Sequence, residues 1–187
     1  MTYLTLKRPS EEHIKEIENF RQELLDRNCT FDGCAGLEEY EDISAWITLC
    51  RLTEKEETKP NPDWVEADTF LLMHEGKERI LGMINFRHYL NDYLSEYGGH
   101  IGYAIRPTEQ RKGYAKAMLA LCLDECRKLG LNKVLLTCDS DNKASYRTIE
   151  ACGGHFERMT ELDGIGVARY WITIRGGTDR NQKTTHT

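Results

Sequence analysis

The sequence Gln110-Arg111-Lys112-Gly113-Tyr114-Ala115 follows an apolar, strand-like stretch at 101–105 and begins a strongly periodic helix. A glycine-containing turn at a helix start presents free backbone N–H groups and the positive end of the helix dipole. Arg111 and Lys112 add two cationic side chains to this turn. The arrangement suits an anion such as a pyrophosphate. It is not a P-loop or a dinucleotide fingerprint, because the chain contains neither G-x-x-x-x-G-K-[ST] nor G-x-G-x-x-G.

The length and composition favour one compact domain. A chain of 187 residues is long enough for a substantial core. No apolar run approaches the ~20 residues that span a bilayer, and residues 1–9 lack the apolar segment of a signal peptide. The seven cysteines are scattered and odd in number, with no C-x-x-C pair. We therefore expect a reduced, cytoplasmic protein with no membrane association and no metal site.

Charge is distributed unevenly along the chain. Residues 1–68 contain 17 acids and 8 bases, whereas the other 119 residues contain 14 acids and 17 bases. A nucleic-acid binder would usually be strongly basic, so the net charge of −6 argues against nucleic acid as a partner. The asymmetry suggests that the second part binds a polyanion, while the first presents a negative surface.

Apolar periodicity predicts alternating helices and strands. The segment 28–68 contains several glycines and prolines and is expected to hold one or two helices within 37–52. Residues 176–187 form a polar tail that we expect to be mobile. The remaining patterns predict strands at 2–6, 70–73, 80–86, 100–105, 133–138, 155–162 and 168–174, and helices at 14–25, 115–129 and about 143–151.

This order of elements resembles the GNAT superfamily of N-acetyltransferases, and local motifs strengthen the resemblance. Q-x-x-G-x-A at 110–115 is similar to the family's coenzyme A signature, and 101–107 resembles its I-G-Y-x-[IV]-x-P strand ending. Residues 142–156 are similar to the motif N-x-x-[AS]-x-x-x-x-E-x-x-G-x-x after the fifth strand, and 169–171 resemble a strand ending in a bacterial branch of predicted acetyltransferases.

The resemblance implies an α/β (α+β) acyl-CoA N-acyltransferase fold. Such a fold has a mixed, mostly antiparallel central sheet, helices on both faces, and fourth and fifth strands that splay apart. It implies a single domain at 1–175 with a variable acceptor-side insertion at 28–68. Dimers are common in such folds, so a homodimer is one expectation.

The resemblance also implies acetyl-CoA as co-substrate, bound between the splayed strands. The fourth strand would pair with pantetheine, the turn at 110–115 would bind the pyrophosphate, and the segment after the fifth strand would approach the thiol end. The residues that would bind coenzyme A are then Ala104, Ile105, Arg106, Gln110, Arg111, Lys112, Gly113, Tyr114, Ala115, Asn142 and Ser145.

The residues for proton transfer remain open. Many relatives have an acidic tyrosine seven residues after the motif's asparagine, where this chain has Ile149. Tyr146, almost one helical turn earlier, and Tyr170 are the candidates for the acid that receives the thiolate. His100 stands where many relatives have a glutamate and is a candidate base, with Glu96 as its competitor.

We therefore expect direct transfer of an acetyl group to an amine of a small molecule, peptide or protein. The acidic segment with Trp46 and Trp64 favours a cationic acceptor, through charge attraction and cation–π contact. Ile149 leaves an alternative open, a non-catalytic acyl-CoA-binding sensor. A transferase of longer acyl groups is a third possibility.

Overall fold

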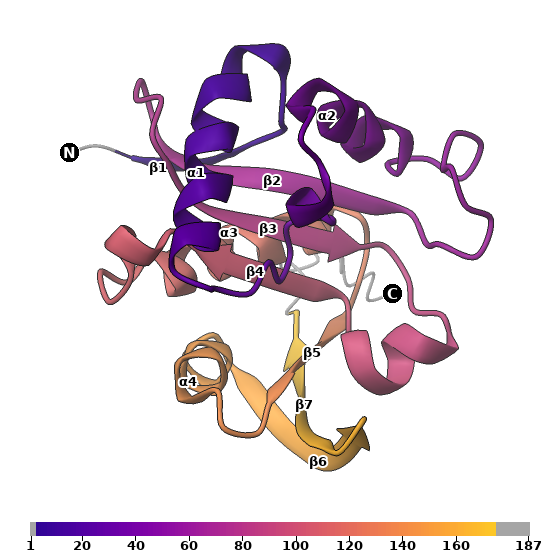
Figure 1. Ribbon diagram of the computed structural model, residues 1–187. Coiled ribbons are helices and arrows are strands. Elements are labelled where there is room, and N and C mark those ends of the chain that lie inside the picture. Colours follow the sequence, from indigo (N-terminus) through magenta and orange to yellow (C-terminus); the bar gives the residue numbers. More distant parts are fainter. Residues whose placement is uncertain (1–2, 175–187) are drawn as a thin grey trace, which may run out of the picture.

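The computed structural model describes residues 3–174, so the predicted tail at 176–187 lies outside the described residues. The chain forms two antiparallel sheets (Figure 1). The first has the order β1-β2-β3-β4, and the second has the order β5-β7-β6. Their bounds are β1 (Leu4–Lys7), β2 (Ala67–His74), β3 (Ile80–Arg87), β4 (Ile101–Ile105), β5 (Lys133–Asp139), β6 (Gly154–Leu162) and β7 (Ile165–Thr173).

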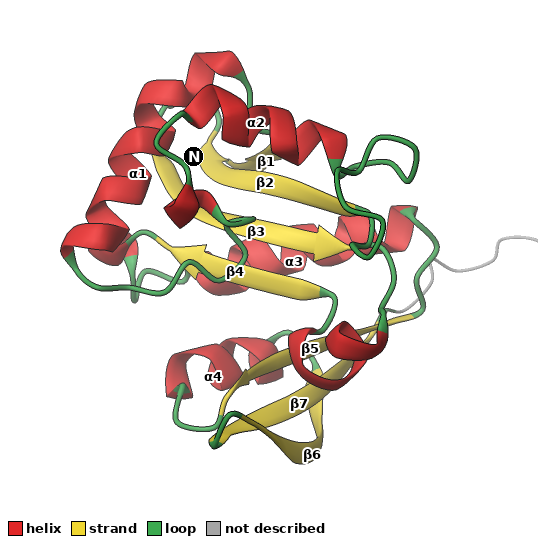
Figure 2. Ribbon diagram, turned by 45° about the vertical axis from the view of Figure 1, so that its right-hand side comes forward, coloured by secondary structure: helices red, strands yellow, loops and turns green. Residues whose placement is uncertain are grey.

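Helices lie on both faces of the first sheet. α1 (Ile14–Asp26) and α2 (Ile43–Leu52) cover one face, α3 (Tyr114–Lys128) covers the other, and α4 (Lys143–Ala151) lies beside the second sheet (Figure 2). This arrangement confirms the predicted fold class. Single turns complete the chain: η1 (Glu11–His13), η2 (Leu37–Glu39), the π-helical turn η3 (Leu94–Gly98) and η4 (Pro107–Glu109).

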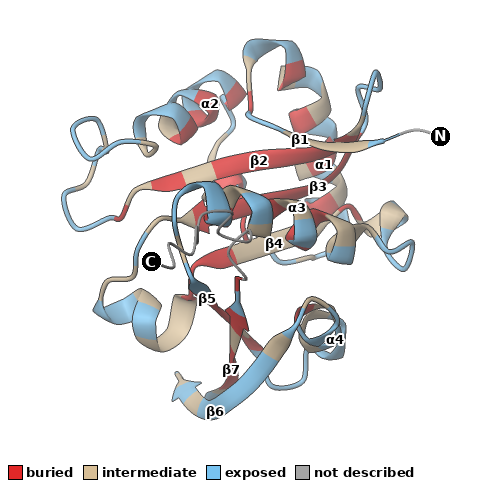
Figure 3. Ribbon diagram, turned by 180° about the vertical axis from the view of Figure 1, so that it is seen from behind, coloured by how far each residue is buried: buried red, intermediate tan, exposed pale blue. Residues whose placement is uncertain are grey.

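Two apolar cores fill the spaces between these layers. The core under α1 and α2 includes Phe20 and Trp46, both fully buried. The core under α3 includes Met118 of α3, Ile84 of β3 and Leu136 of β5, so it joins the two sheets. Seen from behind, the buried strands lie beneath the exposed outer surface of α3 (Figure 3). Each fully buried large side chain contributes about 1.5–3 kcal/mol to stability.

The segment 28–68 is part of this domain core. Cys34, Leu37, Trp46 and Ile47 have no exposed surface and pack under α1 and against the first sheet. The predicted helices within 37–52 are η2 and α2. Asp42 caps α2 by accepting hydrogen bonds from the backbone of the next turn, as its residue type predicts.

The two sheets meet at one place and then separate. The backbone N–H of His100 donates to the carbonyl of Leu135 at 2.7 Å, and Leu135 N–H donates to Nδ1 of His100 at 2.9 Å. Gly99 has φ +65°, and a Cβ there would lie 2.6 Å from Leu135 O, so no side chain fits. Within the described chain, β4 forms a strand ladder with β3 alone. The predicted splay of the fourth and fifth strands is therefore present.

Candidate active site

The turn at 110–115 has the geometry of an anion site. Arg111 and Gly113 adopt positive φ values of 63° and 84°, and α3 begins immediately afterwards. Among the residues that the structure describes, the backbone N–H groups of 111–116 have no hydrogen-bond acceptor. A Cβ on Gly113 would meet no atom within 4 Å, so the turn is open on that side. The predicted turn thus offers several free N–H donors at a helix start.

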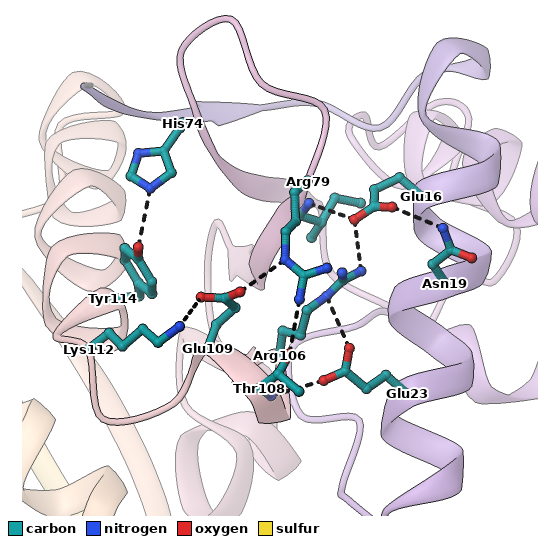
Figure 4. A network of polar contacts seen from close by, with 11 residues as sticks. Glu16, Asn19, Glu23, His74, Arg79, Arg106, Thr108, Glu109, Lys112 and Tyr114 are labelled. Atoms are coloured by element: carbon teal, nitrogen blue, oxygen red, sulfur yellow. Dashed lines mark hydrogen bonds and ion pairs between the residues drawn. The ribbon is translucent and has the colours of Figure 1, made fainter. Parts of the chain in front are cut away.

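The two cations of this turn differ in their surroundings. Arg111 is exposed. Lys112 is also exposed, but its Nζ donates to a carboxylate oxygen of Glu109 at 2.9 Å (Figure 4). The same carboxylate accepts a hydrogen bond from Nε of Arg79 at 2.9 Å. A phosphate group would compete with Glu109 for Lys112, while Glu109 would retain Arg79 as its counter-ion.

Charged residues behind the turn fix its position. Thr108 N–H donates to Glu23 of α1 at 2.9 Å, and the Thr108 hydroxyl accepts from Arg79 at 3.0 Å (Figure 4). On α3, the hydroxyl of Tyr114 lies 3.2 Å from Nε2 of His74. The turn is therefore held from α1 and from β2, which lowers the entropic cost of binding an anion there.

The side chain of Arg106, a predicted pantetheine contact, lies on the α1 side of β4. Its side chain is 2 % exposed and lies between Glu16 and Glu23 of α1, 2.9 and 3.7 Å away, with its guanidinium 5.7 Å from the ring centre of Phe20. Burial lowers the pKa of this guanidinium, although Glu16 opposes the shift. Its backbone N–H donates to Leu81 of β3. Arg106 therefore supports the turn from behind and does not face the gap between the sheets.

The alternation of hydrogen bonds along β4 shows which of its residues turn their backbone groups toward that gap. Arg106 N–H bonds to Leu81 O, and Arg87 N–H bonds to His100 O. In an antiparallel pair every second residue bonds to the partner strand, so the even-numbered residues of β4 point their backbone groups at β3. The backbone groups of Ile101, Tyr103 and Ile105 therefore face the open edge. Of the residues predicted to contact pantetheine, Ile105 lies on the open edge and Ala104 turns its backbone toward β3. Tyr103, which was not predicted, also lies on the open edge.

A hydroxyl pair connects β4 to α4 across the gap. The hydroxyl of Tyr103 lies 3.2 Å from Oγ of Ser145 and 3.4 Å from the Ser145 carbonyl. Burial raises the pKa of Tyr103, while hydrogen bonds to Ser145 and Thr148 act in the opposite direction. The exposed Asn142 caps α4, because its Oδ1 accepts from Ser145 N–H at 3.0 Å. Ser145 is therefore held at the lip of the gap.

The candidate acids lie in the same core as Tyr103. Ile149, at the position of the missing tyrosine, is fully buried. Tyr146 is half-buried against this core. Tyr170 is 6 % exposed, packs edge-on to Phe156 with ring centres 5.6 Å apart, and has its pKa raised by burial.

The two candidate bases are both poorly suited to accept a proton. His100 is buried, and its Nδ1 already accepts from Leu135 N–H, so its proton lies on Nε2. Burial, aided by the positive charge of Arg87, lowers the pKa of His100 to about 4. Glu96 accepts 2.7 Å hydrogen bonds from Arg158 and Thr160, which lower its pKa to about 2.

One of the two tryptophans that were predicted to lie on the acceptor side is part of the core. Trp46 is fully buried, and its Nε1–H donates to the carbonyls of Cys34 and Ala35, so it cannot form part of an aromatic mouth. Trp64 is 44 % exposed and stays a candidate.

Between residues 3 and 174, no cluster of three or more His, Cys, Asp or Glu side chains could hold a metal ion. No helix in that range is long and apolar enough to cross a membrane.

Known proteins show the same architecture. The solved structure of the Microcin C7 self immunity acetyltransferase MccE, in complex with acetyl-CoA and AMP, superimposes with a TM-score of 0.66 at 20% identity, covering 91% of this chain and 92% of that one. At this identity the likeness shows the fold.

Sequence relatives match over shorter segments. A mycothiol acetyltransferase from Actinosynnema mirum is 30% identical over 95 residues, which are 51% of this chain and 31% of that protein. The uncharacterized N-acetyltransferase YnaD of Bacillus subtilis is 28% identical over 88 residues, 46% of this chain and 49% of that protein. The match therefore spans a third to a half of these relatives.

The family profile described as "Acetyltransferase (GNAT) domain" matches residues 3–155, from the first strand to the start of β6. The match includes the anion turn, the open edge of β4 and the capped helix α4. It confirms the resemblance predicted from the motifs: this chain belongs to the GNAT acetyltransferase family.

Proposed function

We propose that this protein transfers an acetyl group from acetyl-CoA directly to an amine. The observation that carries the proposal is the continuity of the anion turn with the open edge of β4. At one end, the backbone N–H groups of 111–116 lack acceptors within the described chain. From there the unpaired backbone of Ile105, Tyr103 and Ile101 extends to His100, where the sheets meet. An elongated molecule with a pyrophosphate at one end matches both features.

Coenzyme A is such a molecule, and the residues present fit it. The turn at 110–115, with Arg111 and Lys112, would hold the pyrophosphate. The open-edge backbone of Tyr103 and Ile105 would pair with the pantetheine amides, as an added strand pairs with a sheet edge. Asn142 and Ser145 would line the opposite lip. When bound, acetyl-CoA supplies an activated thioester carbonyl to the attacking amine.

The absence of a well-placed base agrees with a reaction that deprotonates the amine through water. His100 and Glu96 have pKa values of about 4 and about 2, so at neutral pH both are weak proton acceptors. We infer that ordered water carries the amine proton to solvent. The acceptor is an amine of a small molecule, peptide or protein.

A second candidate function has one observation in its favour. Ile149 replaces the tyrosine of many relatives and is fully buried, so α4 offers no acid at that position. A sensor that binds acyl-CoA without turnover needs no acid. Consumption of acetyl-CoA in the presence of a panel of amines separates the two, because a sensor binds the thioester and leaves it intact.

Thermal unfolding with acetyl-CoA tests the proposal first, with ATP and NAD as controls. At 100 times the dissociation constant a ligand adds about 2.7 kcal/mol to native-state stability. In a domain of this size that corresponds to a rise of roughly 5–11 °C in Tm. A rise specific to acetyl-CoA, followed by turnover in the amine panel, supports the transferase. A cooperative transition that acetyl-CoA does not move contradicts it.

A further inference from the structure

α4 has no acid at the position where many relatives carry one. The position at which many relatives carry a tyrosine is Ile149, which has no exposed surface and packs against Gly154. Tyr170 is buried beneath Phe156. Within the described residues, neither Tyr146 nor Tyr170 makes a side-chain hydrogen bond to a group that could stabilise its phenolate.

Tyr103 differs from both in its position and its partner. It extends from β4 to α4, and its hydroxyl lies 3.2 Å from Oγ of Ser145. The Ser145 backbone is itself fixed by the Asn142 cap. A phenol that loses its proton beside a hydroxyl donor is stabilised by that donor. Ser145 is therefore placed to accept from Tyr103 in one protonation state and to donate to it in the other.

The direction of β4 gives the order in which the proposed ligand would pass its residues. The anion turn follows the C-terminal end of β4, so a pantetheine arm along the open edge extends from Ile105 toward Ile101. These residues span about 13 Å at ~3.3 Å per residue. Tyr103 lies midway, and its backbone belongs to that edge. The ligand would therefore pass Tyr103 before it reaches Ile101, and the Tyr103 side chain crosses the gap to Ser145 of α4 beside that path.

We propose that Tyr103 is the catalytic acid that protonates the departing thiolate, a role that rests on the proposed acetyl transfer. The amine nitrogen forms a bond to the thioester carbonyl carbon and loses a proton to water. The carbon–sulfur bond then breaks, and the sulfur takes the proton of the Tyr103 hydroxyl. Ser145 and solvent return a proton to the phenolate. An amide and the free thiol of coenzyme A result, and no oxidant or metal is required.

Two opposing influences set the acidity of Tyr103. Burial raises its pKa and keeps the hydroxyl protonated at neutral pH, while the hydrogen bonds to Ser145 and Thr148 favour the phenolate that remains after the proton is transferred. The same apolar core contains Cys138, whose thiol is kept protonated because burial raises its pKa to about 11. Among the described tyrosines of this core, Tyr103 alone has its backbone on the open edge of β4 and its hydroxyl hydrogen-bonded to α4.

Three matched variants test the assignment: Tyr103→Phe, Ser145→Ala and Tyr146→Phe. Acetyl-CoA affinity is measured by titration, and kcat with an amine found in the panel. We expect Tyr103→Phe to lower kcat by about 10²-fold or more, the usual size of an acid contribution. Its acetyl-CoA affinity should stay within about twofold. Ser145→Ala should lower kcat less than tenfold, because Tyr103 keeps its proton. Tyr146→Phe tests the competing acid, and a loss of kcat in this variant larger than that in Tyr103→Phe would assign the role to Tyr146.

A second readout is independent of turnover. With ¹³C at Cζ of every tyrosine, the Tyr103 resonance is identified as the one that is missing from the spectrum of Tyr103→Phe. Addition of coenzyme A to the wild-type protein should shift this resonance. If Tyr103→Phe fails to fold, fluorinated tyrosine at 103 keeps the ring and hydroxyl while lowering the pKa of the hydroxyl. In that case kcat should change with the pKa of the hydroxyl.

Several results would overturn the assignment. One is an unchanged kcat in Tyr103→Phe. Another is an equal loss of kcat in Tyr103→Phe and Ser145→Ala, because this would mark the pair as structural only. The third is a Tyr103 resonance that does not respond to coenzyme A. A wild-type protein whose Tm does not respond to acetyl-CoA would instead remove the proposed function, and this assignment with it.

Discussion

The guanidinium of Arg106 lies 2.9 Å from Oε1 of Glu16, with side-chain exposures of 2 % and 19 %. The pair ties the end of β4 to α1. Removal of one partner leaves the other charge poorly solvated. We therefore expect Arg106→Ala to lower the free energy of unfolding by about 3–5 kcal/mol, measured by urea titration. Arg158→Ala, which breaks an exposed pair with Glu96, is the control and should change stability little. Equal effects of the two would contradict the claim.

Backbone conformation at Gly113 should control ligand binding separately from stability. Gly113 and Gly76 have φ values of 84° and 70°, and a Cβ on either would meet nothing within 4 Å. Alanine at either position should cost about 1–2 kcal/mol through the left-handed backbone alone. Only Gly113→Ala should weaken acetyl-CoA binding, by tenfold or about 1.4 kcal/mol. The anion assignment fails if titration finds the same affinity in both variants.

Lys112 should contribute to affinity in a salt-dependent way. Its partner is Glu109 three residues earlier, and Lys128 has the equivalent partner Glu125 far along α3. Lys112→Met should reduce acetyl-CoA affinity about five- to tenfold at low ionic strength, and less at high salt, because exposed charges are screened. Lys128→Met is the matched control. Identical salt dependence in both variants would show that Lys112 does not meet a phosphate.

His100 should make stability depend on pH in a defined window. Its pKa is about 4 in the folded protein against an ordinary value of 6.5. As pH falls below 6.5 the unfolded chain binds a proton that the folded protein refuses until about pH 4, so stability is lost on acidification across that interval. The loss is at most about 3 kcal/mol, reduced by any solvent screening.

The variant His100→Gln cannot be protonated and should lack this part of the slope. Urea titrations of both proteins at several pH values between 7 and 4.5 measure the difference. Parallel pH profiles would show that His100 does not remain neutral in the folded state.

Features that depend on neighbouring residues in sequence were predictable. The turn at 110–115, the cap at Asn142 and the helical positions of α3 each follow from residue types at short spacing. The free N–H groups of the turn were predictable for the same reason. A helix start leaves them without partners whatever the rest of the chain does.

Features that depend on distant residues were not predictable from local patterns. Arg106 directly follows β4, but its partners Glu16 and Glu23 precede it by more than 80 residues. Tyr103 was not predicted, because the register with β3 decides which residues of β4 turn their backbone groups toward the open edge. The low pKa of His100 arises from burial and from the positive charge of Arg87, and no spacing rule relates either to the sequence around His100.

The contact between His100 and Leu135 lies where the gap between the two sheets begins. The last link before the sheets part is an imidazole nitrogen in place of a peptide carbonyl. A peptide carbonyl is present at every residue, whereas an imidazole is present only where the gene places one. At this junction His100 therefore acts twice, as a donor through its backbone N–H and as an acceptor through its ring, so a substitution that removes the ring would leave the backbone of Leu135 with one partner fewer where the gap begins.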